Sequence, residues 1–321
     1  MRADHPARAA RYVSVAGAGT MGNAYFGVLD ALEDHLPGYE AWRSSLRGVS
    51  GCSAGSICVL ALVLGLDRAA RRELVDLFDV RRVVQTPDLA LLVQEYGADR
   101  GAGLRTCVET MLARGGLSAS ATLGDLRRLL RIEFACVCTN VDDDQTRAHT
   151  LSSERTPHVR VADAIAASCA VPLLFCPATV DGCTLVDGCL SSNLPTLFPP
   201  DETLYVRTTP SCRGRVRDWQ EYLTRLAQCC MALQPACGAE FAAAHAGRYV
   251  VVNTAHTGLR SLQLNLDRAQ CTLLVRCGYA AMLDVLLDGA LVRGAGRAFG
   301  AYLAARVAAV SADAEERPPP A

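Results

Sequence analysis

Two glycine-rich turns near the start of the chain constrain its fold most strongly, because each lies between an expected strand and an expected helix. The first turn follows a short apolar strand at Tyr12–Ala16 and precedes an amphipathic helix at Asn23–His35. The second follows a strand that ends near Ser50 and precedes an apolar helix that runs to Leu64. This alternation predicts parallel strands with covering helices, since parallel neighbours need a crossover connection.

The rest of the chain continues this pattern after a long helical stretch. Residues 67–130 are mostly helical in pattern, which fits either a cap over a site or ordinary crossover helices. Strand character returns at Ile132–Cys138, and the pair Asp181-Gly182 predicts a hairpin between Ala178–Val180 and Cys183–Val186. Further elements are expected at 161–167 (helix), 204–207 and 249–253 (strands) and 269–287 (helix).

We therefore expect an α/β fold, a three-layer sandwich in which a mixed, mostly parallel central sheet is flanked by helices. The chain has 321 residues, of which 50% are hydrophobic, so it can bury a sizeable core. No repeat or linker divides it, and we expect a single domain over residues 1–310. Residues 311–321 include three consecutive prolines and few apolar side chains, which predicts a disordered tail.

The composition argues against several classes of protein. A formal net charge of -1 gives no global electrostatic case for binding nucleic acid. The 15 cysteines are scattered and include no C-x-x-C pair, so we expect free thiols in a reducing compartment and no zinc site. No unbroken apolar run is long enough to span a bilayer, and Met1–Arg11 lacks the apolar region of a signal peptide. These features predict a cytoplasmic protein that is at most peripheral to membranes.

The motif Gly51-x-Ser53-x-Gly55 provides a candidate nucleophile. A serine on a sharp strand-to-helix turn needs small neighbours, because its backbone is strained and a flanking side chain would collide. The helix that begins at the serine directs N–H groups toward developing negative charge. Chance would produce this motif in roughly one such chain in ten, but the strand before it and the apolar helix after it supply the required context.

The earlier turn, Gly17–Gly22, allows three interpretations. A dinucleotide-binding G-x-G-x-x-G fingerprint needs an acidic residue at the end of the next strand, but that strand ends at Ser50 and leads into the serine motif. An oxyanion hole needs backbone N–H groups that face an acyl carbonyl oxygen, and this is the interpretation we favour. A purely structural turn is the third.

Three Asp-Gly pairs offer candidate bases. Asp181 has its own explanation as the hairpin turn, and Asp288 follows a long helical pattern and resembles a helix end. Asp187 finishes the returning strand, and catalytic groups gather at strand ends in parallel sheets. On its own, such a pair is more often a turn than a base.

In this order, the glycine-rich loop, the serine motif and Val186-Asp187-Gly188 resemble those of the patatin-like phospholipases. The resemblance covers residues 12–196, and the C-terminal third adds little to it. The block at 161–168 is similar to the family's stretch before its catalytic aspartate. Other agreeing positions are Tyr96-Gly97, Gly101, Thr139-Asn140, Val171-Pro172, Phe175-x-Pro177 and Asn193-x-Pro195.

The resemblance implies a phospholipase A or lipase that cleaves carboxylic ester bonds of phospholipids or glycerides. The family's nucleophile falls on Ser53, and its aspartate, which accepts the proton without a histidine, falls on Asp187. The substrate would be a lipid presented at a membrane or lipid-aggregate interface. The resemblance implies neither a metal nor an organic cofactor.

The same resemblance places the family's three-glycine oxyanion loop on Gly17, Ala18 and Gly19, with Gly22 closing the pattern. Ala18 replaces the usual middle glycine, and an alanine cannot take a positive φ cheaply. Cys189 follows Asp187-Gly188, where a glycine or alanine is more usual. These departures bear on rate and specificity rather than on the type of reaction.

Two alternatives stay open from the sequence. In a Ser-His-Asp α/β-hydrolase, His245 or His256 would follow Asp187 in the required order, although that fold places several strands before its serine and here only two precede Ser53. The other alternative is a non-catalytic relative that binds lipid but has lost its hydrolytic activity because the oxyanion loop is altered.

Overall fold

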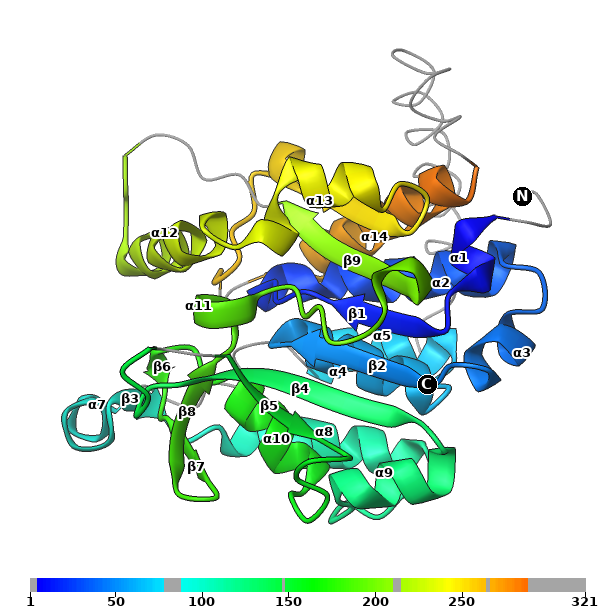
Figure 1. The fold of residues 1–321 in the computed structure, drawn as a ribbon. Coiled ribbons are helices and arrows are strands. Elements are labelled where there is room, and N and C mark those ends of the chain that lie inside the picture. The colour runs from blue at the N-terminus through cyan, green and yellow to red at the C-terminus, as the bar shows by residue number, and fades with distance from the viewer. Residues whose placement is uncertain (1–4, 78–87, 146–147, 210–214, 264–265, 288–321) are drawn as a thin grey trace, which may run out of the picture.

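A computed structural model describes residues 5–77, 88–145, 148–209, 215–263 and 266–287. Its centre is an eight-stranded sheet that consists, in spatial order, of β10 (Tyr249–Asn253), β9 (Thr203–Thr209), β1 (Tyr12–Val15), β2 (Gly48–Cys52), β4 (Glu133–Asn140), β8 (Cys183–Asp187) and β7 (Ala178–Val180), with β5 (Ala148–Ser152) paired to β4. The neighbours from β10 to β4 are parallel, whereas β8, β7 and β5 pair antiparallel. Figure 1 shows the parallel strands with their carboxyl ends at the left.

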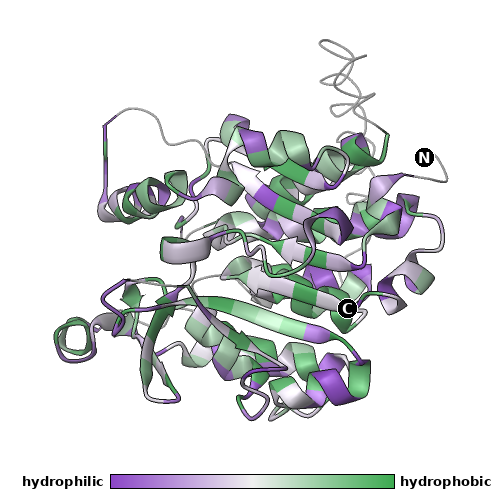
Figure 2. Cartoon of the chain, in the orientation of Figure 1, coloured by the Kyte–Doolittle hydropathy of each residue, from purple (hydrophilic) through white to green (hydrophobic). Residues whose placement is uncertain are grey.

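Helices flank this sheet and cover its apolar strands. α4 (Ala54–Val63) packs on β1 and β2, and α2 (Asn23–His35) packs on α14 (Arg268–Leu286). Every residue of β2 is buried, and β4 is buried except at its two ends, as the hydrophobic colouring of β4 in Figure 2 also indicates. The predicted α/β class, with a mixed and mostly parallel central sheet, is confirmed.

The other described helices are shorter or lie outside this central packing. They are α1 (Pro6–Ala9), α3 (Tyr39–Ser44), α5 (Arg68–Leu77), α7 (Leu89–Glu95), α8 (Ala102–Arg114), α9 (Leu123–Leu130), α10 (Val161–Ser168), α11 (Cys189–Ser192), α12 (Trp219–Ala232) and α13 (Ala239–Ala244). A second, two-stranded sheet joins β3 (Gly97–Asp99) to β6 (Leu173–Phe175).

Several local predictions are confirmed in detail. The helix expected at Asn23–His35 has those bounds. Asp181 and Gly182 have φ of 49° and 78°, as the predicted two-residue hairpin turn requires. β5 and the two-stranded sheet were not expected. Residues 78–87 of the stretch expected to be mostly helical and the tail at 311–321 lie outside the described residues.

α2 and α14 approach each other unusually closely because each carries a glycine at the crossing. A Cβ atom at Gly27 would lie 1.8 Å from the carbonyl oxygen of Val275. A Cβ atom at Gly278 would lie 1.7 Å from the carbonyl oxygen of Ala24. The C-terminal helix is thereby held against the helix that follows the glycine-rich turn.

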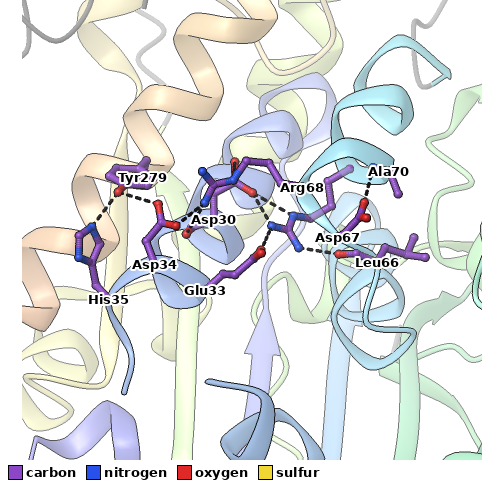
Figure 3. A network of polar contacts seen from close by, with 10 residues as sticks. Asp30, Glu33, Asp34, His35, Leu66, Asp67, Arg68, Ala70 and Tyr279 are labelled. Carbon is purple, nitrogen blue, oxygen red and sulfur yellow. Dashed lines mark hydrogen bonds and ion pairs between the residues drawn. The ribbon is translucent and has the colours of Figure 1, made fainter. Parts of the chain in front are cut away.

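A polar network also ties α2 to α5 and α14 (Figure 3). The buried Arg71 guanidinium donates to Asp30 at 2.6 Å and also contacts Glu33. The Tyr279 hydroxyl donates to Asp34 at 2.9 Å and lies 2.7 Å from His35 Nε2. Burial raises the pKa of Asp30, and the neighbouring Arg71 charge opposes that rise. Arg68 also lies 3.7 Å from Asp30, so two arginines share the carboxylates of α2.

One described helix, α14, is long and apolar enough to cross a membrane by length and composition alone. A helix that packs within a soluble domain passes the same test. Its sequence is interrupted by charged residues such as Arg276 and Asp284, in keeping with the lack of an unbroken apolar run.

We expect Gly278→Ala to lower the free energy of unfolding by about 2–3 kcal/mol, because the new methyl group would overpack the α2–α14 crossing. Urea denaturation would measure this change. Gly238→Ala is the matched control, since its Cβ would meet only the Pro235 carbonyl oxygen, at 3.2 Å. Equal stability of the Gly278→Ala and unaltered proteins would contradict the close helix contact.

Candidate active site

Ser53 occupies a strained turn between β2 and α4. Its φ is 51°, in the left-handed region that residues other than glycine seldom adopt. A Cβ atom at Gly51 would lie 2.4 Å from the Ser56 nitrogen, and one at Gly55 would lie 2.2 Å from the Val15 carbonyl oxygen. Only glycine therefore fits at the two flanking positions of the motif.

Ser168 at the end of α10 fixes the backbone of this turn. Its hydroxyl accepts a hydrogen bond of 2.9 Å from the Ser53 N–H and donates one of 2.6 Å to the Val137 carbonyl oxygen. The Ser56 hydroxyl oxygen lies 3.2 Å from the Ser168 hydroxyl oxygen. The local pattern at 161–168 does not indicate this role for Ser168, because the hydrogen bond joins residues 115 positions apart.

Asp187 lies at the end of β8 and is almost completely buried, with 1% of its surface exposed. Its Oδ1 accepts a hydrogen bond of 2.9 Å from the Cys189 N–H. Its Oδ2 makes no hydrogen bond with a described residue. Burial raises the pKa of Asp187 above its ordinary value, while the Cys189 backbone and the nearby Ser53 side chain oppose that rise.

The strand that carries Asp187 runs against its neighbour, which corrects the expectation of a parallel strand end. β8 pairs antiparallel with β4, and Asp187 lies opposite Cys138. On the other side of β4, Val137 pairs with Cys52, the residue before the nucleophile. β8 therefore ends beside the carboxyl end of β2, and this places the Asp187 carboxylate next to Ser53.

Some N–H groups of the glycine-rich turn donate hydrogen bonds to carbonyl oxygens of other segments, and others are free. The Gly17 N–H donates to the Asn193 carbonyl oxygen at 3.1 Å, and the Thr20 N–H donates to the Ser261 carbonyl oxygen at 2.7 Å. Within the described part of the chain, the N–H groups of Ala18 and Gly19 have no acceptor.

The backbone angles of this turn suit its residues. Ala18 has a φ of −148°, so this position does not require the positive φ that would favour a glycine. Gly19 has a φ of +54°, and a Cβ atom on it would lie 2.0 Å from the Ser261 carbonyl oxygen. A Cβ atom on Gly22 would lie 2.5 Å from that of Ala54, next to the nucleophile.

Gly17 brings the turn directly onto the nucleophile. A Cβ atom there would lie 3.2 Å from the Ser53 Cβ and 2.7 Å from Asn193 Oδ1. The Gly17 N–H is already bonded to Asn193, so Gly17 serves to let the turn lie close to Ser53. The free N–H donors are those of Ala18 and Gly19.

Gln234, at the end of α12, holds the segment that follows Asp187. Its side chain accepts a hydrogen bond of 2.6 Å from the Asn193 N–H and donates one of 2.9 Å to the Cys189 carbonyl oxygen. Nothing in the local sequence indicated this contact, because Gln234 lies 41 and 45 positions from its partners.

An apolar cavity opens beside Ser53. Ser53, Ala54, Gly19 and Gly22 form the part of its wall nearest the turn. The rest of the wall is mainly apolar and comprises Phe26, Ile57, Leu104, Val171, Leu174, Phe175 and Leu262, together with Thr20, Asn23 and Cys169. Such a lining suits an acyl chain better than a polar group.

The histidines considered from the sequence have other partners. His245 stacks on Phe241 and lies 2.7 Å from that residue's carbonyl oxygen, and His256 lies 3.6 Å from the Cys277 sulfur. None of the residues that line the cavity is a histidine. The described residues also hold no group of three or more His, Cys, Asp or Glu side chains suited to a metal ion.

Comparisons with known proteins place the chain in a family. The model of the patatin-like phospholipase family matches residues 13–199, more than half of the 321 residues. Among solved structures, the crystal structure of VipD from Legionella pneumophila aligns with a TM-score of 0.63 and 17% identity, over 87% of this chain and 67% of VipD. The type III effector ExoU aligns with a TM-score of 0.49 and 17% identity, over 88% of this chain and 54% of ExoU. No curated protein sequence matches the chain.

The structure thus combines an α/β sandwich with a serine on a strained turn beside a buried carboxylate. The chain belongs to the patatin-like phospholipase family. Its likeness to VipD shows the shared fold, and membership of the family supports lipid hydrolase activity. The segments that carry Gln234 and Ser261 lie beyond the matched residues 13–199.

We expect Asp187→Asn to raise the melting temperature, because a buried carboxylate with a raised pKa costs stability whenever it is ionised. That cost is absent at low pH, where the carboxyl is protonated in both the folded and the unfolded state. It grows as pH rises above the ordinary carboxyl pKa and is complete above the raised pKa of the folded state. The increase should therefore be larger at about pH 8 than at about pH 3. Asp181→Asn, at a half-exposed side chain, is the control. A lower melting temperature for Asp187→Asn at both pH values would contradict this reading.

Proposed function

We propose that the protein is a serine lipid acyl hydrolase that cleaves carboxylic ester bonds of phospholipids or glycerides through a Ser53–Asp187 dyad. The observation that carries the proposal is the buried Asp187 carboxylate, one oxygen of which has no described partner, next to a serine on a strained turn. A buried acceptor without a donor is costly in a structural role, but it suits the removal of a proton.

The dyad would act by general-base and nucleophilic catalysis. The Ser53 oxygen attacks the ester carbonyl carbon, and its proton passes to Asp187. When the tetrahedral intermediate collapses, the leaving alcohol takes that proton. A water molecule then gives a proton to Asp187 and attacks the acyl-serine, which releases the fatty acid and restores the serine. The raised pKa makes Asp187 a stronger base than an ordinary carboxylate.

The negative charge on the carbonyl oxygen would be stabilised by the free N–H groups of Ala18 and Gly19. Both are backbone donors held in place before the reaction, which is the requirement for an effective oxyanion hole. Gly17 and Gly22 would provide the space that lets this turn approach Ser53 and Ala54. The alanine at position 18 is compatible with this role, because its φ is negative.

The same site also suggests how the chain is organised. β9 and β10 extend the sheet that carries the dyad, and α14 packs on α2, so residues beyond the family match complete the catalytic unit. We propose that residues 1–310 act as one domain. Its apolar acyl cavity favours a substrate drawn from a membrane or lipid aggregate, where the protein would bind peripherally.

Ser53→Ala should reduce fatty acid release to background, because no other group would form the acyl intermediate. The measurement is mass spectrometry of products from a mixture of phospholipids and neutral glycerides, which also identifies the lipid class and acyl position. Ser118→Ala, at an exposed serine, should retain full activity. Hydrolysis by Ser53→Ala at the unaltered rate, with an unchanged circular dichroism spectrum, would refute the assignment of the nucleophile.

Asp187→Asn should lower kcat by about 10²–10⁴-fold, because asparagine keeps the shape of the side chain but cannot accept the proton. Asp181→Asn should leave kcat nearly intact, since asparagine also suits the hairpin turn.

The double variant His245→Gln/His256→Gln completes this comparison and should retain most of the activity. If Asp187→Asn were active and the double histidine variant inactive, the site would have to be reassigned as a Ser-His-Asp triad.

A further inference from the structure

α12 has an inverted arrangement of polar and apolar side chains. Its polar residues Glu221 and Thr224 are 1% and 2% exposed, and Glu221 accepts hydrogen bonds from Arg217 and Arg225. Its outward face carries exposed apolar and aromatic side chains at spacings of three or four residues. These form the apolar stripe, which consists of Trp219, Tyr222, Leu226, Cys229 and Leu233. Surface helices of globular proteins usually present the opposite arrangement.

The apolar stripe is large enough to require an explanation. Trp219 and Tyr222 are each 54% exposed, and Leu233 is 86% exposed. Single exposed apolar residues are common, but a row of them along one helix face marks a binding surface.

Both ends of α12 are bonded to the candidate active site. At its end, Gln234 bonds to Cys189 and Asn193 in the segment that follows Asp187. At its start, Asp218 accepts a hydrogen bond of 2.5 Å from Arg260, whose carbonyl oxygen accepts one of 3.1 Å from the Thr20 hydroxyl. The helix therefore lies next to the site, at the end of the sheet where the nucleophile lies (Figure 1).

A second exposed apolar group lies at the same end of the sheet. α7 presents Leu89, Val93 and Tyr96, each more than 70% exposed. It packs on β3, which pairs with β6, and β6 supplies Leu174 and Phe175 to the cavity wall. α7 and α12 both lie at the left of Figure 1, and the ribbon of each includes hydrophobic residues, drawn in green in Figure 2.

We propose that the apolar stripe of α12 is the surface by which the protein docks on a lipid bilayer or aggregate, with α7 as the second point of contact. This inference rests on the proposed lipid acyl hydrolase function, because a lipid substrate must pass from an aggregate into the adjacent cavity. Tryptophan and tyrosine favour the membrane–water interface, where an apolar ring and a polar group are both accommodated. The exposed Arg215, which precedes the helix, suits anionic headgroups.

The unaltered protein carries its own reporter for this contact. Of its two tryptophans, Trp42 is 5% exposed and Trp219 is 54% exposed. Vesicles of phosphatidylcholine and phosphatidylglycerol should shift the fluorescence emission of the protein to shorter wavelength, and brominated phosphatidylcholine should quench it. Trp219→Phe should show neither change. Protein that floats with the vesicles but shows no shift and no quenching would overturn the proposal, because another surface would then be bound.

Removing the stripe gives an independent test. Tyr222→Ser/Leu226→Ser should bind the same vesicles at least about tenfold more weakly, because two side chains would no longer be buried in lipid. Its rate on a monomeric short-chain ester should stay unchanged. Leu129→Ser, at an exposed leucine of α9, is the matched control and should bind like the unaltered protein. Equal binding by all three proteins, or no binding by the unaltered protein, would overturn the proposal.

Two further outcomes separate this inference from its competitors. Ser53→Ala should bind vesicles and shift its fluorescence normally, because the docking surface does not include the nucleophile. Lipid binding by the unaltered protein without any hydrolysis would reject the proposed function and leave the docking surface standing. Light scattering tests a second copy of the chain as the occupant. A dimer that Tyr222→Ser/Leu226→Ser converts to a monomer, with vesicle binding unchanged, would overturn the lipid surface in favour of self-association.

Discussion

The arrangement of the site depends on one buried carboxylate. Asp187 loses the hydration of its charge, keeps a single strong hydrogen bond from the Cys189 N–H, and leaves Oδ2 without a described partner. Such a group is destabilising unless the surrounding backbone holds it in place. That backbone is held by bonds from the Asp187 N–H to Ala170 and from Thr139 to the Asp187 carbonyl oxygen. The fold thus maintains a costly group where a proton acceptor is needed.

The C-terminal third, which the family match does not reach, supports both halves of the site. The Ser261 carbonyl oxygen accepts the hydrogen bond of the Thr20 N–H. The same oxygen lies so close to position 19 that only a glycine fits there. Gln234 fixes the segment after Asp187 from the other side. α14 holds α2, the helix that continues from the glycine-rich turn, through a contact that excludes side chains at the crossing. The part of the chain that resembles the family least therefore positions the part that resembles it most.

The sequence predicted the features that are encoded locally. A strained serine between glycines, a two-residue Asp-Gly turn and an amphipathic helix each depend on a few neighbouring residues, and Ser53, Asp181 and α2 have the expected geometry. The antiparallel direction of β8 and the Ser168 contact depend on residues far apart in the chain, so no local pattern indicated them. β5 escaped prediction because its first three residues are exposed or half-buried and only its last two are buried, so its sequence lacks the alternation typical of a strand.

The most direct test of the account is the structure of the protein after reaction with a fluorophosphonate, whose phosphoryl oxygen stands in for the oxyanion of the tetrahedral intermediate. The account predicts a covalent bond to the Ser53 oxygen, with the phosphoryl oxygen within hydrogen-bond distance of the Ala18 and Gly19 N–H groups and the alkyl chain in the apolar cavity. An adduct on another residue, or a phosphoryl oxygen turned away from both N–H groups, would contradict it.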